Sequence, residues 1–437
     1  MADQKISFHQ EIPVIAECDV FIAGGGPAGC AAAWGASKSA ASVFLAERGG
    51  CFGGMGTAGL VPAFTGHYDG RRMICGGFGA IVFERMKACG EMPGNPNAIQ
   101  PEKLKQIYDT LMAECKIDFA FESEVIGVCK NADNCITEAV ISTVEGLRAV
   151  RAKTYIDATG DGSLARAAGA AYEIGDEMGR IMPASLCSSW SNIDWEEKIR
   201  SGADERELQH AAIREKRYFK IPDYHMTGMS PSGTSTASGN IGHIFGVNPI
   251  SLRSRTAAWL EGRRILPEYG AFYRENVPGF EHCELNASAS LLGVRESCRI
   301  CGEYQLTRED YYHAQSFPDS IGVFHYGIDI HPYDNSPEEW KRFKDEFYEP
   351  KLKPGVNCMI PYRVLCVKDF RNLLTAGRCI STDHYAEASL RVMPTCFVTG
   401  QAAGCAATLS AQTGCPVKSV DVTVLQGKLK QLGAILE

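Results

Sequence analysis

The apolar and polar positions of the chain fall into two kinds of segment. Three short strand-like runs, 20–23, 155–158 and 372–376, each lead into a glycine turn. A short apolar run bounded by turn residues is typical of a buried strand. Apolar residues elsewhere recur at helical spacing, which predicts helices over 81–86, 101–115, 195–200, 204–218, 251–261 and 393–410. Strands that alternate with helices predict an α/β fold with a parallel sheet.

The segment 117–156 has short strand-like runs in place of the helical spacing. Its residues predict short strands with turns at 131–134 and at 145–146. We therefore expect a small antiparallel meander inserted into the parallel-sheet domain. The stretch from Arg180 to about Pro354 mixes helices, Gly/Ser-rich loops and a strand-like piece over 322–330, and we expect it to form a second domain.

The first strand-like run ends in the pattern G-x-G-x-x-G, formed by Gly24, Gly26 and Gly29. In dinucleotide-binding folds the first glycine allows the turn, the second lets the backbone approach a pyrophosphate, and the third allows close helix–strand packing. A second apolar run ends in Glu47, eighteen residues after Gly29 (47 − 29). This is close to the spacing of roughly 20 residues at which an acidic side chain reaches a ribose hydroxyl. We interpret the stretch as a dinucleotide site rather than as a turn with a structural role only.

The residues after Glu47 are too rich in glycine for a helix or an ordinary strand. The segment 48–57 contains five glycines and ends in Thr57. Glycine lets the backbone lie close to a ligand. Backbone N–H groups and a threonine hydroxyl would suit the middle of an extended dinucleotide, whereas the alternative is a flexible surface loop.

Length and charge restrict the number of domains and the kinds of partner that we expect. The 437 residues are enough for two domains, and the net charge of −8 comes without a dense basic run. Nucleic acid and an anionic membrane surface are therefore not expected as partners. The chain has no apolar run of about 20 residues. Its first nineteen residues lack a charged region followed by an apolar core. These observations predict a cytoplasmic protein with no membrane span.

The eighteen cysteines are scattered through apolar segments rather than grouped at framework spacings, which favours free buried thiols. Cys298 and Cys301 form a C-x-x-C pair, which we interpret as two residues on adjacent turns of a helix rather than as a redox dithiol. The spacings of iron–sulfur and zinc ligands are absent, so no metal is expected.

Three sets of motifs support a resemblance that covers nearly the whole chain. They are Glu47-Arg48 through Gly53-Gly54, the segment GVRES at 293–297, and a C-terminal block that runs from AGRCIS at 376–381 through RVMPTC to Gly404. With these motifs the sequence is similar to the glutathione-reductase-like superfamily of two-dinucleotide-fold flavoproteins. It resembles most closely a family of FAD-dependent oxidoreductases.

The resemblance implies an α/β fold, with a Rossmann-like FAD/NAD(P)-binding parallel sheet, an inserted antiparallel meander and a mixed α+β substrate domain. Residues 1–175 and 355–437 would form a discontinuous FAD-binding domain, and 176–354 a substrate or cap domain. The resemblance also implies residues that hold the pyrophosphate, the adenosine, the middle of the cofactor and the flavin: Gly24, Gly26, Pro27, Ala28, Gly29, Glu47, Arg48, Gly53, Gly54, Thr57, Val125, Thr159, Gly160, Asp161, Gly377, Arg378, Thr395 and Cys396.

One position departs from the wider superfamily. Gly377 is followed by Arg378, where the superfamily usually has Gly-Asp. The usual ribityl contact therefore does not transfer to this position. A cation here could instead pair with phosphate. The N-terminus of the helix at 393–410 is expected to face the pyrimidine end of the flavin, where its dipole would stabilise an anionic reduced ring.

Candidate catalytic residues come from the same motifs. Arg391 precedes the flavin-facing helix, and Arg295 with Glu296 comes from GVRES. A guanidinium there could hold a carboxylate or oxyanion, or the Arg–Glu sequence could form an ion pair that ties the domains together. His384 and Tyr385 lie near the flavin block, and a histidine beside a hydride acceptor can exchange protons, although a packed histidine is equally consistent. His325 and His331 are further candidates.

The function expected from these features is an FAD-dependent oxidoreductase that transfers a hydride between flavin N5 and a small organic substrate. A flavin-binding electron carrier without its own small-molecule substrate is the alternative from a different class. An NAD-dependent dehydrogenase would need no third glycine junction. Because no second fingerprint for NAD(P)H occurs, the electrons are expected to pass to or from substrate, a quinone or an electron-transfer partner protein.

Overall fold

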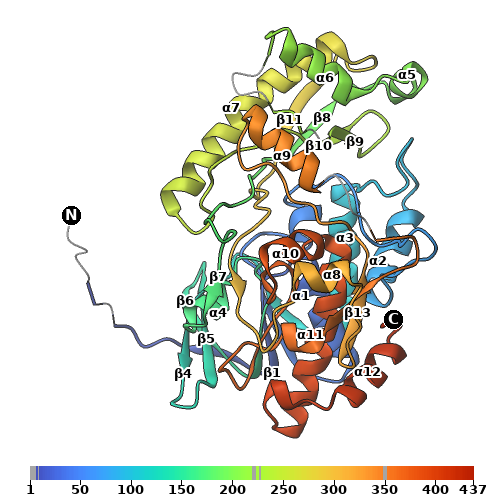
Figure 1. The fold of residues 1–437 in the computed structure, drawn as a ribbon. Helices are drawn as coiled ribbons and strands as arrows, with labels where there is room; N and C mark the ends of the chain where they lie inside the picture. The colour runs from blue at the N-terminus through green and yellow to red at the C-terminus, as the bar shows by residue number, and fades with distance from the viewer. Residues whose placement is uncertain (1–5, 8, 219–222, 226–227, 348–351) are drawn as a thin grey trace.

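A computed structural model describes the chain except residues 1–5, 8, 219–222, 226–227 and 348–351. The molecule has two parts, visible as the lower and upper halves of Figure 1. The lower part contains the large sheet and the C-terminal helices, and the upper part contains a smaller sheet covered by helices. Residues 1–5, which belong to the N-terminal segment in which no leader is expected, lie outside the described residues.

The large sheet has seven strands in the order β3-β2-β1-β6-β5-β4, with β15 paired to β6. Strands β3, β2, β1, β6 and β15 are parallel to their neighbours, whereas β4, β5 and the N-terminal part of β6 form an antiparallel meander. The strands are β1 (Val14–Ala23), β2 (Val43–Ala46), β3 (Asp118–Ala120), β4 (Glu124–Lys130), β5 (Ile136–Thr143), β6 (Gly146–Asp157) and β15 (Leu373–Thr375).

The predicted parallel sheet is therefore confirmed, and the three strand-like runs belong to its strands β1, β6 and β15. The prediction for 117–156 was wrong in one respect. The first piece, β3, pairs with β2 in the parallel direction and extends the main sheet, and the meander begins only at β4. The meander is continuous with the parallel sheet, because β6 pairs with β5 on one edge and with β1 on the other.

Two helices of small residues pack together on one face of this sheet. They are α1 (Pro27–Lys38) and α11 (Met393–Thr413). A side chain at Gly400 would lie 2.8 Å from the carbonyl carbon of Ala28, and one at Gly404 would lie 2.8 Å from that of Ala32. Backbone therefore meets backbone, so the glycines and alanines of the C-terminal block are explained by this packing.

The lower part is completed by helices that the apolar spacing largely predicted. The helix α3 has the predicted bounds and buries Leu104, Ile107 and Leu111. The helices of this part, besides α1 and α11, are α2 (Phe78–Ala88), α3 (Pro101–Cys115), α4 (Ser163–Ala167), α8 (Arg308–Tyr312), α10 (His384–Leu390) and α12 (Val422–Gln431).

The upper part has a four-stranded antiparallel sheet in the order β11-β8-β10-β9. Its core gathers large side chains such as Trp190, Phe272 and Tyr273. The helix predicted over 251–261 continues through Pro267 to Asn276. The elements are β8 (Ser188–Ser191), β9 (Gly228–Pro231), β10 (Ala237–Asn240), β11 (Glu284–Ser288), α5 (Trp195–Ser201), α6 (Glu205–Arg214), α7 (Leu252–Asn276) and α9 (Pro337–Phe347).

Two short ribbons connect distant parts of the chain. Strand β12 (Arg299–Ile300) pairs with β7 (Tyr172–Glu173), and β13 (Ser320–Phe324) pairs with β14 (Cys358–Pro361). The strand-like piece at 322–330 is thus regular only to Phe324. The helix expected at Cys298 and Cys301 was also wrong, because both flank β12, where neighbouring residues point to opposite faces. All eighteen cysteines are free.

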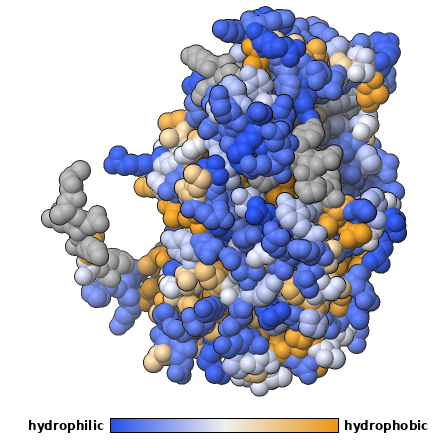
Figure 2. All heavy atoms as spheres, in the orientation of Figure 1, coloured by the Kyte–Doolittle hydropathy of each residue, from blue (hydrophilic) through white to orange (hydrophobic). Residues whose placement is uncertain are grey.

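Polar residues predominate on the face shown in Figure 2, with apolar residues in small groups. Within the described ranges, no helix combines the length and the apolar character that a membrane crossing requires.

Candidate active site

A cavity of about 640 Å³ extends from the glycine turn of β1 to the upper part of the molecule. One end is lined by the carboxyl ends of β1, β2 and β6 and by β4. The other end is lined by residues of the upper sheet, by the segment 291–295 and by the α10–α11 junction. Segments that are far apart in sequence therefore share one elongated space, as expected for a long ligand in an open α/β sheet.

The three glycines of the fingerprint have different surroundings. Gly24 has a φ of +94°, and a side chain there would lie 2.8 Å from the carbonyl oxygen of Ala158. A side chain at Gly29 would lie 2.9 Å from the carbonyl carbon of Gly24 and closer still to its oxygen. At Gly26 a side chain would meet no heavy atom of the described residues within 4 Å, and Gly26 lines the cavity. The first and third glycines are needed for close backbone packing, and the second leaves space for a ligand.

Glu47 holds the glycine loop against the first turn. Its Oε2 accepts a hydrogen bond from Gly25 N at 2.6 Å, and its Oε1 accepts one from Gly49 N at 2.6 Å. Each oxygen has a second lone pair, and Glu47 lines the cavity, so the carboxylate can still accept from a ribose hydroxyl. Thr57 is fully buried and donates to the carbonyl of Phe52 at 2.6 Å, so its hydroxyl is committed to the loop.

Arg378 is neutralised inside the protein. Its Nη2 donates to Asp161 Oδ1 at 2.6 Å, its Nε donates to the carbonyl of Gly160 at 2.9 Å, and its Nη1 donates to the carbonyl of Val294. Asp161 also accepts from Arg255 at 2.8 Å. Burial would raise the pKa of Asp161, but Arg378 and Arg255 outweigh it and hold this pKa below its usual value. The guanidinium is thus paired with a carboxylate, where sequence reasoning suggested phosphate.

The N-terminus of α11 faces the cavity through Val392, Met393 and Cys396. Thr395 is buried, and its carbonyl accepts from the Thr399 hydroxyl at 3.1 Å. The first turn of a 21-residue helix therefore directs its free N–H groups toward this space.

Most of the expected cofactor residues line the cavity. Those that do are Gly24, Gly26, Pro27, Ala28, Glu47, Arg48, Gly54, Val125, Thr159, Gly160, Asp161, Gly377, Arg378 and Cys396. Four of them do not line the cavity but lie next to the backbone that lines it: Gly29, Gly53, Thr57 and Thr395. Space at Gly26, a carboxylate at Glu47 and a helix N-terminus at the far end fit the pyrophosphate, the adenosine ribose and the isoalloxazine of FAD.

Comparison with known families decides the class of protein. Residues 19–429 match the model of a family described as FAD dependent oxidoreductase. The chain belongs to this family. It is an FAD-dependent oxidoreductase, and its cofactor is FAD.

Solved structures also match the chain at low sequence identity. A geranylgeranyl bacteriochlorophyll reductase-like protein from Thermoplasma acidophilum is 16% identical, with a TM-score of 0.46, over 95% of this chain and 83% of that one. The p-nitrophenol 4-monooxygenase PnpA from Pseudomonas putida DLL-E4 is 12% identical, with a TM-score of 0.43, over 96% and 84%. No curated protein matches. The family assignment therefore depends on the family model alone.

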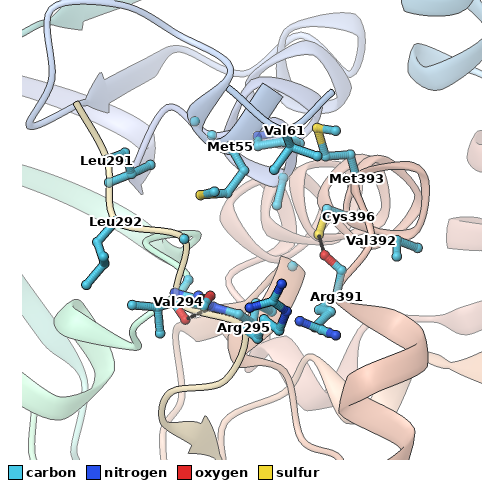
Figure 3. Close-up of a pocket in the computed structure, with 18 of the residues that line it drawn as sticks. Met55, Val61, Leu291, Leu292, Val294, Arg295, Arg391, Val392, Met393 and Cys396 are labelled. Atoms are coloured by element: carbon cyan, nitrogen blue, oxygen red, sulfur yellow. Dashed lines mark hydrogen bonds between the residues drawn. The ribbon is translucent and has the colours of Figure 1, made fainter. Parts of the chain in front are cut away.

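Two arginines form one wall at the far end of the FAD cavity. Figure 3 shows Arg295 and Arg391 close together, across the cavity from Met55. Arg295 is buried, and its hydrogen bonds go to neutral groups: the carbonyl of Pro183 at 2.8 Å, the Ser185 hydroxyl at 3.0 Å and Asn240 Oδ1 at 3.5 Å. Burial and the neighbouring Arg391 lower the pKa of Arg295 to about 10, so it remains charged at neutral pH.

The Arg–Glu pair considered from the sequence does not form between Arg295 and Glu296. Glu296 instead accepts from Arg299 Nη1, and its Oε1 lies 2.8 Å from His384 Nδ1. His384 Nε2 lies 2.7 Å from the hydroxyl of Tyr333. Among the described residues, Arg295 therefore has no carboxylate within hydrogen-bonding distance. Arg391 is partly paired, because its Nη2 donates to Asp329 at 3.1 Å.

The sequence candidates thus divide into two groups. Arg295 and Arg391 line the cavity, whereas Glu296, His384 and Tyr385 do not. His384 and Glu296 are fully buried partners in a network behind the cavity wall, and Tyr385 lies with its ring 4.4 Å below the guanidinium of Arg308. His331 lines the cavity, and His325 does not.

Sequence reasoning missed other polar residues of the cavity wall. They include His225, Asn240, Tyr326 and Asp329. The pattern around Tyr326 and Asp329, in FHYGIDIHP, had drawn attention only to its histidines. His225 and Asn240 reach the wall through the folding of the upper sheet, which leaves no local signal in the sequence.

Proposed function

We propose that this chain catalyses hydride transfer between FAD and a small organic anion bound between the two arginines. The observation that carries the proposal is the buried Arg295 in the cavity wall, whose hydrogen bonds within the described part of the chain go to neutral groups. A desolvated guanidinium without a carboxylate is stabilised by an anionic ligand, and it can hold a carboxylate through two hydrogen bonds. When bound, FAD supplies the hydride acceptor or donor.

The protein's contribution is position and charge. Arg295 and Arg391 would orient the anionic group, while Met55, Leu291 and Leu292 would pack against the apolar part of the substrate. The α11 N-terminus would favour negative charge on the reduced ring. Electrons would return through a second substrate, a quinone or an electron-transfer protein.

The proposed division of the chain assigns 1–175 and 355–437 to FAD binding and 176–354 to the cap. In support, β15 and α11 pack with the first sheet and helix, and β8–β11 form their own sheet. Residues 299–300 and 320–324, which the division assigns to the cap, instead pair with strands at 172–173 and 358–361 and so lie against the FAD-binding part. We also propose a cytoplasmic location, because eighteen free thiols suit a reducing compartment.

The test is anaerobic mixing of the FAD-loaded protein with a metabolite panel, read as bleaching of flavin absorption, followed by identification of the product. Anionic metabolites are expected to bleach the flavin, and their uncharged amides or esters are not. A flavin that dithionite reduces but no metabolite reduces would contradict the proposal and would favour an electron carrier.

A further inference from the structure

A chain of titratable groups runs from the cap to the cavity wall. Asp223 accepts from His243 N at 2.8 Å, and Asp223 Oδ1 lies 2.9 Å from His243 Nδ1. His243 Nε2 lies 2.8 Å from His331 Nδ1. His331 Nε2 lies 3.5 Å from Asp329 Oδ2, and both His331 and Asp329 line the cavity. The chain thus connects a buried carboxylate with the space expected to hold substrate.

The hydrogen-bond partners determine where the protons lie. Burial would raise the pKa of Asp223, but His243 outweighs it and holds this pKa below its usual value, so Asp223 only accepts. His243 Nδ1 must therefore carry a proton. When both rings are neutral, His243 Nε2 accepts and His331 Nδ1 donates. His331 Nε2 is then left with a lone pair beside Asp329, which is also an acceptor.

This lone pair is available at neutral pH. Burial and Arg295 hold the pKa of His331 well below its usual value. Burial and His243 lower the pKa of neighbouring His225 to about 4. A proton that reached His331 Nε2 would be repelled by the arginines, and a shift along the chain would move it to His243. Among the described residues, the charged and titratable groups around His331 and its partners are His225, His243, Asp223, Asp329, Tyr326, Arg295 and Arg391.

Proton transfer along the chain needs no rotation of either ring. If His331 Nε2 gains a proton, His331 Nδ1 can release its own proton to His243 Nε2. The charge then lies on the ring that is bonded to the Asp223 carboxylate, away from the arginine wall. This arrangement couples an acceptor in the cavity wall to a buried carboxylate, as in catalytic triads.

From this geometry we infer that His331 Nε2 is the general base that removes the substrate proton, with His243 and Asp223 as positioning residues that stabilise the transferred charge. The inference rests on the proposed function. It implies a substrate with a carboxylate for Arg295 and an O–H or N–H on the carbon that loses hydride, namely a hydroxy- or amino-carboxylate. The C–H bond breaks with its electron pair going to FAD, the O–H or N–H proton goes to His331, and the remaining pair forms C=O or C=N.

The hydrogen-bonded rings give a signature that does not depend on activity. Proton NMR of the FAD-loaded protein should show a ring N–H signal downfield of the backbone amides. His331→Gln and His243→Gln should each remove it, and His313→Gln should not, because His313 is an exposed residue at the C-terminal end of α8 whose ring, among the described residues, bonds to the carbonyl of Glu309. His384, which faces Glu296, should give a separate signal that persists in these variants, so only a wild-type spectrum without a signal that both His331→Gln and His243→Gln remove would overturn the inference.

The catalytic role is tested with lactate, malate, glycerate and alanine as anaerobic probes, each supplied as both enantiomers. At least one probe should bleach the wild-type flavin. His331→Gln should slow this reduction by a factor of about 10² or more. His243→Gln should slow it less, and its rate should fall at a lower pH than in wild type when the solution is acidified, because the proton on the base is then less stabilised. His313→Gln should match wild type in both respects.

The outcomes separate the two proposals. Bleaching only by anionic metabolites that carry no hydroxyl or amino group on the carbon that loses hydride, with none of the four probes active, would preserve the proposed function and overturn the hydroxy- or amino-carboxylate class. Equal reduction rates in wild type and His331→Gln would overturn the role of His331 alone. If His331→Gln does not fold, the rate and pH profile of His243→Gln together with the NMR signal decide the matter.

Discussion

The sharpest prediction concerns two glycines three residues apart. Gly26→Ala should leave the apoprotein folded and weaken FAD binding, whereas Gly29→Ala should destabilise the fold itself. The contrast follows from their surroundings, because an added methyl group at Gly26 meets open cavity and one at Gly29 meets the backbone of Gly24. Gly26 is the N-cap of α1 and Gly29 lies in its first turn, so their neighbourhood is otherwise shared.

The magnitudes follow from the distances. At Gly29 the new carbon would lie 2.9 Å from the carbonyl carbon of Gly24, whereas carbon atoms ordinarily approach to about 3.5–4.0 Å. Moving α1 away from β1 to relieve this overlap should cost about 3 kcal/mol of unfolding free energy. At Gly26 the overlap arises only with the pyrophosphate. An overpacking cost of about 1–3 kcal/mol corresponds to roughly 5- to 150-fold weaker FAD binding.

The assay pairs urea unfolding of the apoproteins with FAD titration followed by flavin fluorescence. Gly427→Ala is the matched control, since Gly427 lies exposed on α12 with open space around it, and this change should stabilise the helix by about 0.5–1 kcal/mol without altering FAD affinity. Unaltered FAD affinity in Gly26→Ala would refute the reasoning, because the open space would then not be the pyrophosphate site.

Three further changes test other parts of the account. In Glu47→Gln the amide N–H₂ group faces one of the two backbone N–H groups that now donate to the carboxylate, so a hydrogen bond is lost there. FAD binding measured by titration should weaken by about 1–3 kcal/mol, and unchanged affinity would argue against a ribose role. Arg295→Gln should leave FAD binding intact but weaken binding of an anionic substrate about 10- to 100-fold, read as the concentration that half-saturates flavin bleaching. Burial and Glu296 raise the pKa of Glu387 to about 8, so the folded state binds more protons than the unfolded state above the ordinary value of 4.5. Unfolding free energy should therefore decrease as pH rises through this window, by up to about 1.4 kcal/mol per pH unit, and urea unfolding of Glu387→Gln near pH 6 and near pH 8 should show a smaller decrease than wild type.

Much of the fold could be predicted because its signals are local. Apolar runs that end at glycines identified β1, β6 and β15, and helical spacing gave α3 its bounds. The helix predicted over 393–410 is α11, and its small residues allow the close approach of Gly400 to Ala28. In each case the neighbouring residues alone restrict the conformation.

What could not be predicted depends on contacts between distant segments. The strand at 118–120 extends the sheet because β2 has a free edge, and the residues 118–120 alone do not indicate which strand they pair with. Arg378 looked available for phosphate because its partner Asp161 lies 217 residues away. The histidine chain joins His243 to His331 across 88 residues. Local patterns identify such residues, but only tertiary packing determines their partners.

The central claim is that glycine turns from separate parts of the chain surround one FAD molecule, and amide hydrogen exchange with and without FAD tests it most directly. The account predicts that FAD slows exchange together in 24–29, 47–57, 123–125, 158–162 and 376–378, and leaves α12 unchanged. Slower exchange confined to 24–29 and 47–57 would contradict it, because the ligand would then occupy only the first glycine turn and its loop.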